Sequence, residues 1–328
     1  MNSFCFFNTV DAWGGGEKWH LEIANHLKLS GHKVFIITRP ESELSIRATT
    51  FGIDVFHVKL SNLSFINPFL INRLVNEIRK RSVQTIVLNL SRDLKCGGIA
   101  SKIAGVKNII FRRGSDRSVR NYFFNRFLYQ KIITGILTNS NATKNSILSK
   151  GISLVAPKKI KVIYNGINID EFKNKKFNSL GLKNRGFLIL AAMGRLAPQK
   201  NFEFLIPVAL NLKKRGLAFK IIIAGSGPQE NYLKSIVNEN NLDKELIFLG
   251  FINNSKDLLM SADIFLLPSL WEGFGYVLIE ASLSRLPIIA FDTSSNSEVV
   301  SKTSGFLTPT NQVKPFCDKI EYLFFNKK

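Results

Sequence analysis

Short apolar runs alternate with segments of helical periodicity along nearly the whole sequence of 328 residues. Typical runs are Phe4–Phe7, Val34–Thr38 and Phe219–Ala224, while Gly16–Leu29 places apolar residues three or four positions apart. Apolar runs without a polar face are typical of strands buried on both sides, and helices join such strands in parallel sheets. The sequence therefore predicts an α/β protein with doubly wound parallel sheets.

The alternation is interrupted once, at residues 170–186, which are polar, basic and without periodicity. We interpret the interruption as a linker, which predicts a domain over residues 1–172, a linker over 173–186 and a second domain over 187–328. The two domains are expected to face each other across a cleft. Ligands of doubly wound sheets bind at the carboxyl ends of the strands, so the cleft is the expected site.

The composition of the chain is strongly basic, which is compatible with an anionic partner. The chain holds 45 lysines and arginines against 24 acidic residues, a formal net charge of +21. Nucleic acid, anionic lipid or a phosphorylated substrate fits this excess, and a basic solvated surface explains it equally well. Cys5, Cys96 and Cys317 form no close pair, which favours a reducing compartment. Without a membrane-spanning stretch or a basic leader, the chain is expected in the cytoplasm, free or attached to a surface.

Two glycine-rich turns follow predicted strands. Gly14-Gly15-Gly16 opens the first helix, and Gly225-Ser226-Gly227 follows the second strand of the second domain. Backbone amides approach a ligand closely where no side chain intervenes, and a helix start favours an anion. Each turn taken alone is also consistent with a plain connection.

Fixed cations follow the first strand of the second domain. Gly194 and Arg195 come directly after this strand, and Lys200 stands before the next helix. A guanidinium and an ammonium near a helix start are suited to hold a diphosphate. The alternative is two exposed cations in a basic protein.

A glycine-rich loop in the second domain carries two carboxylates. Glu272 precedes Gly273, Phe274 and Gly275, and Glu280 stands eight positions after Glu272 in the predicted helix. The spacing suits an extended ligand with one carboxylate at each end and amides between them. Carboxylates accept hydrogen bonds from sugar hydroxyls. The alternative is a salt-bridged helix residue and a loop charge.

Taken in order, these motifs resemble family-4 retaining glycosyltransferases of the GT-B fold, which has two Rossmann-like domains. The resemblance covers about residues 11 to 309 and also includes Phe248–Phe251 and the Asn165-Gly166 pair in Val162–Phe172. It implies that the second domain binds a nucleotide-sugar donor, expected to be a UDP-sugar, and that the first binds the acceptor.

The resemblance also implies roles for single residues. Arg195 and Lys200 would hold the donor diphosphate, Glu272 the sugar and Glu280 the ribose, and the Gly15-Gly16 loop would close on the diphosphate. The other expected donor-site residues are Gly194, Asn165, Gly225, Ser226, Gly227, Phe251, Gly273, Phe274 and Gly275. No cofactor is expected, and no metal either, since the sequence has no Asp-x-Asp motif. With no protein nucleophile evident, the leaving phosphate would deprotonate the acceptor and the anomeric configuration would be retained.

The chain departs from the family pattern at two places. Many relatives carry a histidine after the fourth strand of the first domain, where this chain has Arg112 and Arg113. In those relatives the histidine lies near the donor sugar. Either arginine is expected to serve in its place, or the acceptor geometry differs, and both arginines are expected acceptor-site residues. The chain ends at Lys328 soon after the last predicted strand, which indicates a compact variant or a truncated reading frame.

The acceptor is inferred from the first domain. Residues 61–70 form an apolar, aromatic loop, and arginines alternate with aromatic residues between Arg112 and Lys131. Such segments dock on anionic membranes. We therefore expect a saccharide or lipid-linked acceptor in polysaccharide or lipopolysaccharide biosynthesis, and peripheral association with the inner leaflet. The alternative is that these aromatics pack against the sheet.

Two other functions remain open at this point. A nucleic-acid-binding protein would explain the charge but not Glu272 and Glu280, so no nucleic-acid partner is expected. A sugar-nucleotide epimerase shares the fold and would consume donor without an acceptor. A dehydrogenase is disfavoured because the sequence has no GxGxxG motif.

Overall fold

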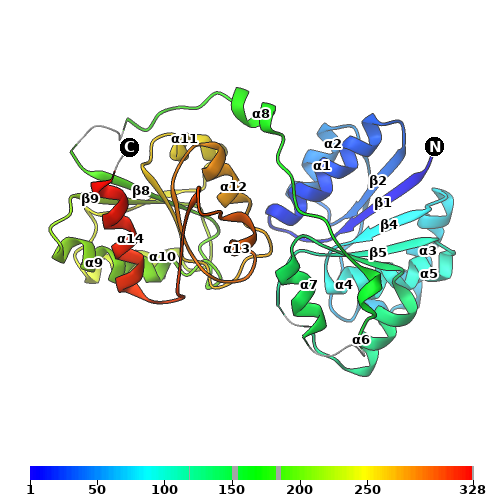
Figure 1. The fold of residues 1–328 in the computed structure, drawn as a ribbon. Helices are drawn as coiled ribbons and strands as arrows, with labels where there is room; N and C mark the ends of the chain where they lie inside the picture. The colour runs from blue at the N-terminus through cyan, green and yellow to red at the C-terminus, as the bar shows by residue number, and fades with distance from the viewer. Residues whose placement is uncertain (118, 150–153, 182–185, 327–328) are drawn as a thin grey trace. The chain divides into compact units, whose positions relative to one another are not determined.

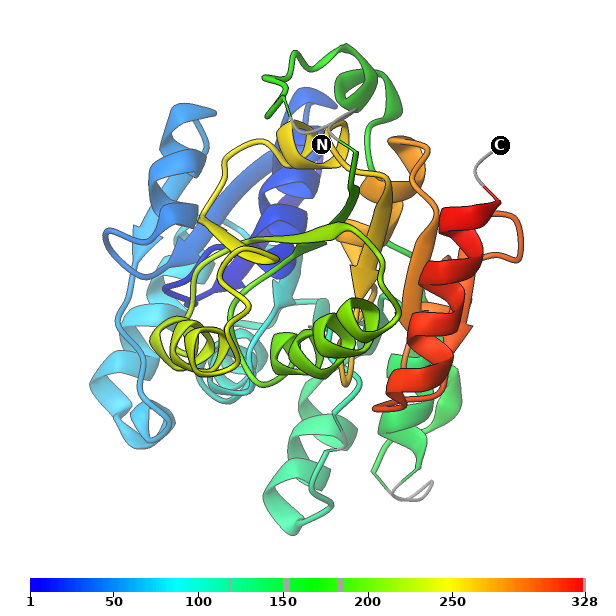
Figure 2. The ribbon, with the colours of Figure 1, turned by 90° about the vertical axis from the view of Figure 1, so that its left-hand side faces the viewer.

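The computed structural model of the protein describes residues 1–117, 119–149, 154–181 and 186–326. By their contacts, these residues divide into two compact units, Met1–Asn165 and Gly166–Lys328. Each unit contains one parallel sheet with helices on both faces (Figures 1 and 2).

The first unit contains a seven-stranded sheet in the order β3-β2-β1-β4-β5-β6-β7, and all its pairs are parallel. Its strands are β1 (Ser3–Asn8), β2 (Lys33–Thr38), β3 (Asp54–His57), β4 (Thr85–Leu88), β5 (Asn108–Arg113), β6 (Gly135–Thr138) and β7 (Ile160–Val162). The strand order reverses between β1 and β4, which makes this pair the topological switch point.

Both faces of this sheet are buried, as the apolar runs predict. Phe7 of β1 joins the core on one face and Phe6 joins the core on the other. Successive side chains of a strand point to opposite faces, so a strand covered on both sides must be apolar throughout.

Helices cover both faces of the first sheet. Those of α-type are α1 (Gly15–Leu29), α2 (Glu43–Thr50), α3 (Pro68–Lys80), α4 (Ser91–Asp93), α5 (Ile99–Ala104), α6 (Phe123–Phe127) and α7 (Asn141–Leu148). Short 3-10 or π-helical turns are η1 (Ser64–Ile66), η2 (Leu94–Gly98), η3 (Leu128–Ile132) and η4 (Pro157–Lys159). Ser42, Asn67 and Ser140 cap α2, α3 and α7 by accepting backbone N–H groups of the first turn.

The second unit contains a six-stranded parallel sheet in the order β10-β9-β8-β11-β12-β13. Its strands are β8 (Leu188–Met193), β9 (Phe219–Ala224), β10 (Leu246–Gly250), β11 (Ile264–Leu267), β12 (Ile288–Phe291) and β13 (Gly305–Thr308). Here the switch point lies between β8 and β11, which pair through Ile264 with Leu190.

Helices also cover both faces of the second sheet. They are α8 (Ile169–Asn174), η5 (Phe202–Phe204), α9 (Leu205–Lys214), α10 (Glu230–Glu239), α11 (Ser255–Leu259), α12 (Tyr276–Leu283), α13 (Asn296–Val299) and α14 (Val313–Phe325). Phe316 of α14 is fully buried and packs edge-on against Phe204 and Phe291, with ring centroids 5.3 and 5.7 Å away.

Part of the segment that the sequence suggests as a linker is tied to the second unit. The Lys256 ammonium donates to the carbonyls of Lys173 and Lys175 at 2.8 Å each. Phe172, the last residue of the predicted first domain, also belongs to the core of the second unit. Residues 182–185 of the predicted linker lie outside the described residues. Within the part of the chain that the structure describes, each helix is too short or too polar to span a bilayer.

Candidate functional site

Two loops of the second unit leave the sheet at its switch point. The loop after β8 carries Gly194, Arg195 and Lys200, and the loop after β11 carries Glu272. Because β8 and β11 are hydrogen-bonded neighbours, these loops emerge side by side at the carboxyl edge of the sheet. The structure thus brings together the fixed cations and the first of the two predicted glutamates.

Hydrogen bonds of both the backbone and the side chain of Gln199 join the two loops. The Leu270 N–H donates to the Gln199 carbonyl at 2.9 Å, and the Gln199 amide donates to the Trp271 carbonyl at 2.9 Å. The Ser295 hydroxyl, which precedes α13, donates to the Glu272 carbonyl at 3.3 Å. These contacts fix the loop that presents Glu272.

Lys200 and Glu272 form an ion pair. The Lys200 Nζ lies 2.5 Å from the Glu272 Oε1, and the two side chains are 14% and 7% exposed. Arg195, in contrast, is exposed to solvent. Since Glu272 balances the charge of Lys200, Arg195 supplies the excess positive charge of these two loops.

The glycines after β8 and β9 allow the two loops to approach closely. A Cβ on Gly225 would lie 1.9 Å from the Gly194 carbonyl oxygen, and one on Gly227 would lie 2.3 Å from that of Leu196. The Leu196 N–H donates to the Ser226 carbonyl at 3.0 Å. Packing thus accounts for the two glycines in Gly225-Ser226-Gly227.

The loop after β10 joins the same edge of the sheet. The Gly225 N–H donates to the Gly250 carbonyl at 2.7 Å, and the next residue, Phe251, is 63% exposed. Phe251 therefore presents an aromatic face next to the Gly225 turn.

The glycine-rich loop after Glu272 leads into α12. Gly273 is half-buried and Phe274 is buried, while Gly275 caps the helix with φ +78°, a conformation that favours glycine. Glu280 is half-buried in the second turn of α12, and its carbonyl accepts from the Ser284 hydroxyl at 2.9 Å. Glu272 and Glu280 thus stand on one continuous segment that runs from the loop into the helix.

The predicted residues of the first unit gather at its own switch point. Gly15 and Gly16 begin α1, after β1, and a Cβ on Gly16 would lie 3.5 Å from Asn89, which follows β4. The buried Arg112 of β5 donates to the Asn89 side chain at 3.3 Å. Arg112 therefore lies next to the Gly15-Gly16 loop.

Three further residues of this cluster, Glu17, Trp19 and His20, have no role assigned from the sequence motifs. The buried Glu17 carboxylate accepts from the Asn8 amide at 3.0 Å, and the Arg112 guanidinium stacks 4.6 Å from the centroid of the Trp19 ring. His20 is fully buried, and both burial and the nearby Arg112 lower its pKa well below the usual value. Glu17 and His20 stand in the sequence pattern Glu-x-x-His directly after the glycines, and this pattern could have identified them as site residues. Their spacing, however, also fits two residues on one face of an ordinary helix.

For two other predicted residues of the first unit, Arg113 and Asn165, the structure gives local surroundings only. Arg113 is half-buried and donates to the Arg117 carbonyl. Asn165 is buried, and its side-chain oxygen accepts no hydrogen bond from the described residues. Asn165 is the last residue of the first unit.

A buried carboxylate supports the loop after β1. Asp93 accepts from the Thr9 hydroxyl at 2.5 Å and from the Leu90 N–H at 3.0 Å. Burial raises the pKa of Asp93 to about 6, although these hydrogen bonds oppose the shift.

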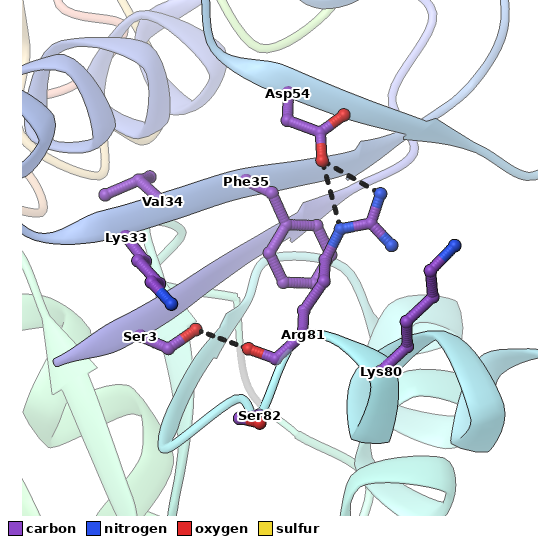
Figure 3. A pocket seen from close by; sticks show the side chains of 8 residues that line it. All are labelled: Ser3, Lys33, Val34, Phe35, Asp54, Lys80, Arg81 and Ser82. Atoms are coloured by element: carbon purple, nitrogen blue, oxygen red, sulfur yellow. Dashed lines mark hydrogen bonds and ion pairs between the residues drawn. The ribbon is translucent and has the colours of Figure 1, made fainter.

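A cavity of about 380 Å³ lies at the opposite edge of the first sheet, at the amino ends of β1, β2 and β3 (Figure 3). Arg81 lies over the Phe35 ring there and donates two hydrogen bonds to Asp54, at 2.9 and 3.1 Å. Ligands of doubly wound sheets bind at the other edge, so we do not assign the function to this cavity. Among the described residues, no group of three or more His, Cys, Asp or Glu is arranged to hold a metal ion.

Family models match both units. Residues 13–171 match the model "Glycosyltransferase Family 4", and residues 172–328 match the model "Glycosyl transferases group 1". The boundary between the two matches lies close to the division of the chain into units.

The curated relatives are glycosyltransferases, and two of the bacterial ones are matched over most of this chain. The chain is 30% identical over 261 residues to the UDP-Gal:alpha-D-GlcNAc-diphosphoundecaprenol alpha-1,3-galactosyltransferase of Escherichia coli, covering 74% of this chain and 67% of that enzyme. It is 31% identical to the capsular polysaccharide biosynthesis glycosyltransferase CapH of Staphylococcus aureus, covering 78% and 72%. The chain spans 44% to 50% of the length of several other relatives.

Solved structures share the fold. The glycosyltransferase of Rickettsia africae superposes with a TM-score of 0.85 at 19% identity, covering 99% of this chain and 88% of that one. HepE of Anabaena, solved in complex with UDP, superposes with a TM-score of 0.82 at 19% identity, covering 100% and 91%. These matches, together with the two sheets, confirm the predicted GT-B fold. The chain belongs to the family-4, or group 1, glycosyltransferases.

Proposed function

We propose that the protein transfers a sugar from a nucleotide-sugar, expected to be a UDP-sugar, to a saccharide or lipid-linked saccharide acceptor. The observation that carries this proposal is the junction of the two loops at the switch point of the second unit, where Lys200 of the Arg195 loop pairs with Glu272. The Escherichia coli and Campylobacter jejuni relatives are named for diphosphoundecaprenol substrates, which supports a lipid-linked acceptor.

Charge stabilisation is the chemistry that these loops supply. Cleavage of the sugar–phosphate bond adds a negative charge to the leaving diphosphate and develops oxocarbenium character on the sugar. Arg195 and Lys200 would stabilise the charge on the diphosphate, and the start of α12 would add its positive end. Donor binding would also share the Lys200 ammonium between Glu272 and the phosphate.

The two glutamates would orient the donor. Glu272 would accept hydrogen bonds from sugar hydroxyls, and Glu280 from the ribose. Phe251, Phe274 and the amides of Gly194, Gly225, Ser226, Gly227, Gly273 and Gly275 would complete the part of the donor site that the second unit supplies. Arg112 and Arg113 would contact the acceptor.

Retention at the anomeric carbon is part of the proposal. The departing phosphate would take the proton of the acceptor hydroxyl on the same face as the leaving group. We further propose that the two fixed cations replace a metal, so chelation with EDTA should leave the rate unchanged. A rate lost in EDTA and restored by a divalent cation would overturn this part.

The proposal also includes the subcellular location of the enzyme. A lipid-linked precursor of surface polysaccharide or lipopolysaccharide lies in the cell membrane, so the enzyme would act in the cytoplasm, at the inner leaflet.

Incubation with UDP-sugars and a diphosphoundecaprenol-linked sugar tests the proposal. We expect one UDP-sugar to extend the lipid-linked sugar, and NMR of the product to show the anomeric configuration of the donor. Product with the inverted configuration would overturn the retaining mechanism. Conversion of donor to another UDP-sugar without acceptor would instead establish an epimerase.

A further inference from the structure

The first unit exposes large apolar side chains from two segments that are distant in sequence. Phe69 and Phe123 are 86% and 84% exposed. Four more exposed side chains come from the same segments, and they are Leu63, Ile66, Tyr122 and Phe127. Scattered exposed apolar residues are ordinary, whereas a contiguous group indicates an interaction surface.

Ring contacts show that the two segments are neighbours. Phe65 of η1 lies 4.9 Å from Phe124 of α6, which stacks on Phe127 at 6.4 Å. The Lys95 ammonium lies 5.2 Å from the Phe65 ring and 6.0 Å from the Phe124 ring. Residues 63–69 and 122–127 therefore form one surface, which we name the aromatic surface; α6 lies at the lower end of the first unit in Figure 1.

Local hydrogen bonds hold both segments in place. The Asn67 side chain accepts from the backbone N–H groups of Phe69 and Leu70 at 3.0 and 3.1 Å, which caps α3. The Asn125 amide donates to the Arg120 carbonyl at 2.7 Å, and Arg126 donates to Asn121 at 2.9 Å. The exposed rings are thus presented by ordered backbone.

The two segments that form the aromatic surface, together with the residues that flank them in sequence, carry positive charge only. Residues 59–73 and 117–131 contain no aspartate or glutamate. All their lysines and arginines are exposed, and they are Lys59, Arg73, Arg117, Arg120, Arg126 and Lys131. Exposed apolar side chains next to basic residues match the interface of an anionic bilayer, where rings enter the acyl boundary and cations meet headgroups. The aliphatic Leu63 and Ile66 favour lipid over nucleic acid, whose bases stack on rings.

We propose that the aromatic surface docks the first unit on an anionic membrane, with Phe69 and Phe123 as the inserted side chains. The inference rests on the proposed function in that a lipid-linked acceptor lies in such a membrane. Docking by these two segments would bring the acceptor-binding unit to its substrate.

Vesicle co-sedimentation of the full chain tests the proposal. We expect binding to phosphatidylcholine vesicles that contain phosphatidylglycerol, weaker binding without phosphatidylglycerol, and weaker binding at high salt. The double variant F69S/F123S should bind at least about tenfold more weakly, because each ring loses apolar burial. The matched control F325S removes a ring that is 70% exposed on α14, in the second unit, and should bind as the wild type does.

Two outcomes would overturn the proposal. One is vesicle binding that F69S/F123S leaves unchanged, and the other is displacement of the vesicles by a single-stranded oligonucleotide in a manner that depends on the two rings. Thermal stabilisation by a panel of UDP-sugars, measured on the same variants, separates this proposal from the proposed function. Stabilisation kept without vesicle binding contradicts only the docking, and vesicle binding without stabilisation by any UDP-sugar contradicts only the donor assignment.

Discussion

Because Lys200 and Glu272 form an ion pair, the effect of either residue on the free energy of unfolding depends on the presence of the other. Both side chains are nearly buried, so removal of one leaves an uncompensated charge. We expect Lys200→Met to lower the free energy of unfolding of the second unit by about 3 kcal/mol. The double variant K200M/E272Q should lose much less than the sum of the two single variants in urea unfolding. Additive losses would show that the pair is not coupled.

Asp93 gives the first unit a pH-dependent stability. Its pKa of about 6 in the folded state lies above the unfolded value of 3.8, so the folded state binds the proton more tightly between these values. Stability should therefore fall as pH rises from 4 to 6, by about 3 kcal/mol, and then level off. Urea unfolding followed across this range should show a smaller fall for Asp93→Asn. An equal fall in the variant would assign the pH dependence to other groups.

Gly225 is required by backbone packing. Gly225→Ala would place a methyl group against the Gly194 carbonyl, so we expect a loss of about 3 kcal/mol in unfolding free energy. Gly216→Ala is the matched control, because Gly216 has φ +73° but no atom within 4 Å of the added Cβ. The control should lose about 1 kcal/mol, and equal losses in both variants would contradict the packing argument.

The candidate site residues that follow the strands could be predicted from the sequence, but the contacts between these residues could not. Lys200 and Glu272 are recognisable because each follows an apolar run. Their ion pair depends on β8 and β11 being neighbours, and this pairing joins segments more than seventy residues apart. Arg112 was predicted as an acceptor-site residue, but its contacts with Asn89 and Trp19 were not, because they join separate elements of the first unit.

At the scale of elements, α14 is the clearest addition to the predicted fold. Phe316 packs in the core between Phe204 and Phe291, so Phe316→Ala should leave a cavity and cost about 3–5 kcal/mol. Thermal unfolding should show a large drop in Tm, whereas Phe325→Ala, at an exposed position of the same helix, should change little. A small effect of Phe316→Ala would mean that α14 contributes little to the core.

Most strands could be predicted from the sequence, whereas elements with a short or interrupted apolar pattern could not. β3 is a short edge strand whose only apolar residues, Val55 and Phe56, are half-buried, so its pattern lacks an apolar run. Pro315 interrupts the pattern of α14, but it lies in the first turn, where proline is tolerated. α8 falls in the basic stretch and is held by the tertiary contact of Phe172.

At the scale of the whole molecule, the fold class and family could be predicted because the strand–helix alternation and the motif order extend through both units. The acceptor could not, since no motif specifies it and its evidence is a surface formed by residues 63–69 and 122–127. The charge of +21 is compatible with several anionic partners, so only the arrangement of rings and cations on that surface distinguishes among them.

Calorimetric titration with UDP tests the central claim, that the loops after β8 and β11 hold the diphosphate of the donor. We predict saturable binding to the wild type and to the control Lys234→Ala, whose lysine pairs with Glu230 on α10. Arg195→Ala and Lys200→Ala should each bind UDP at least about tenfold more weakly, because each loses a charge-assisted hydrogen bond. Wild-type affinity for UDP in both variants would contradict the account.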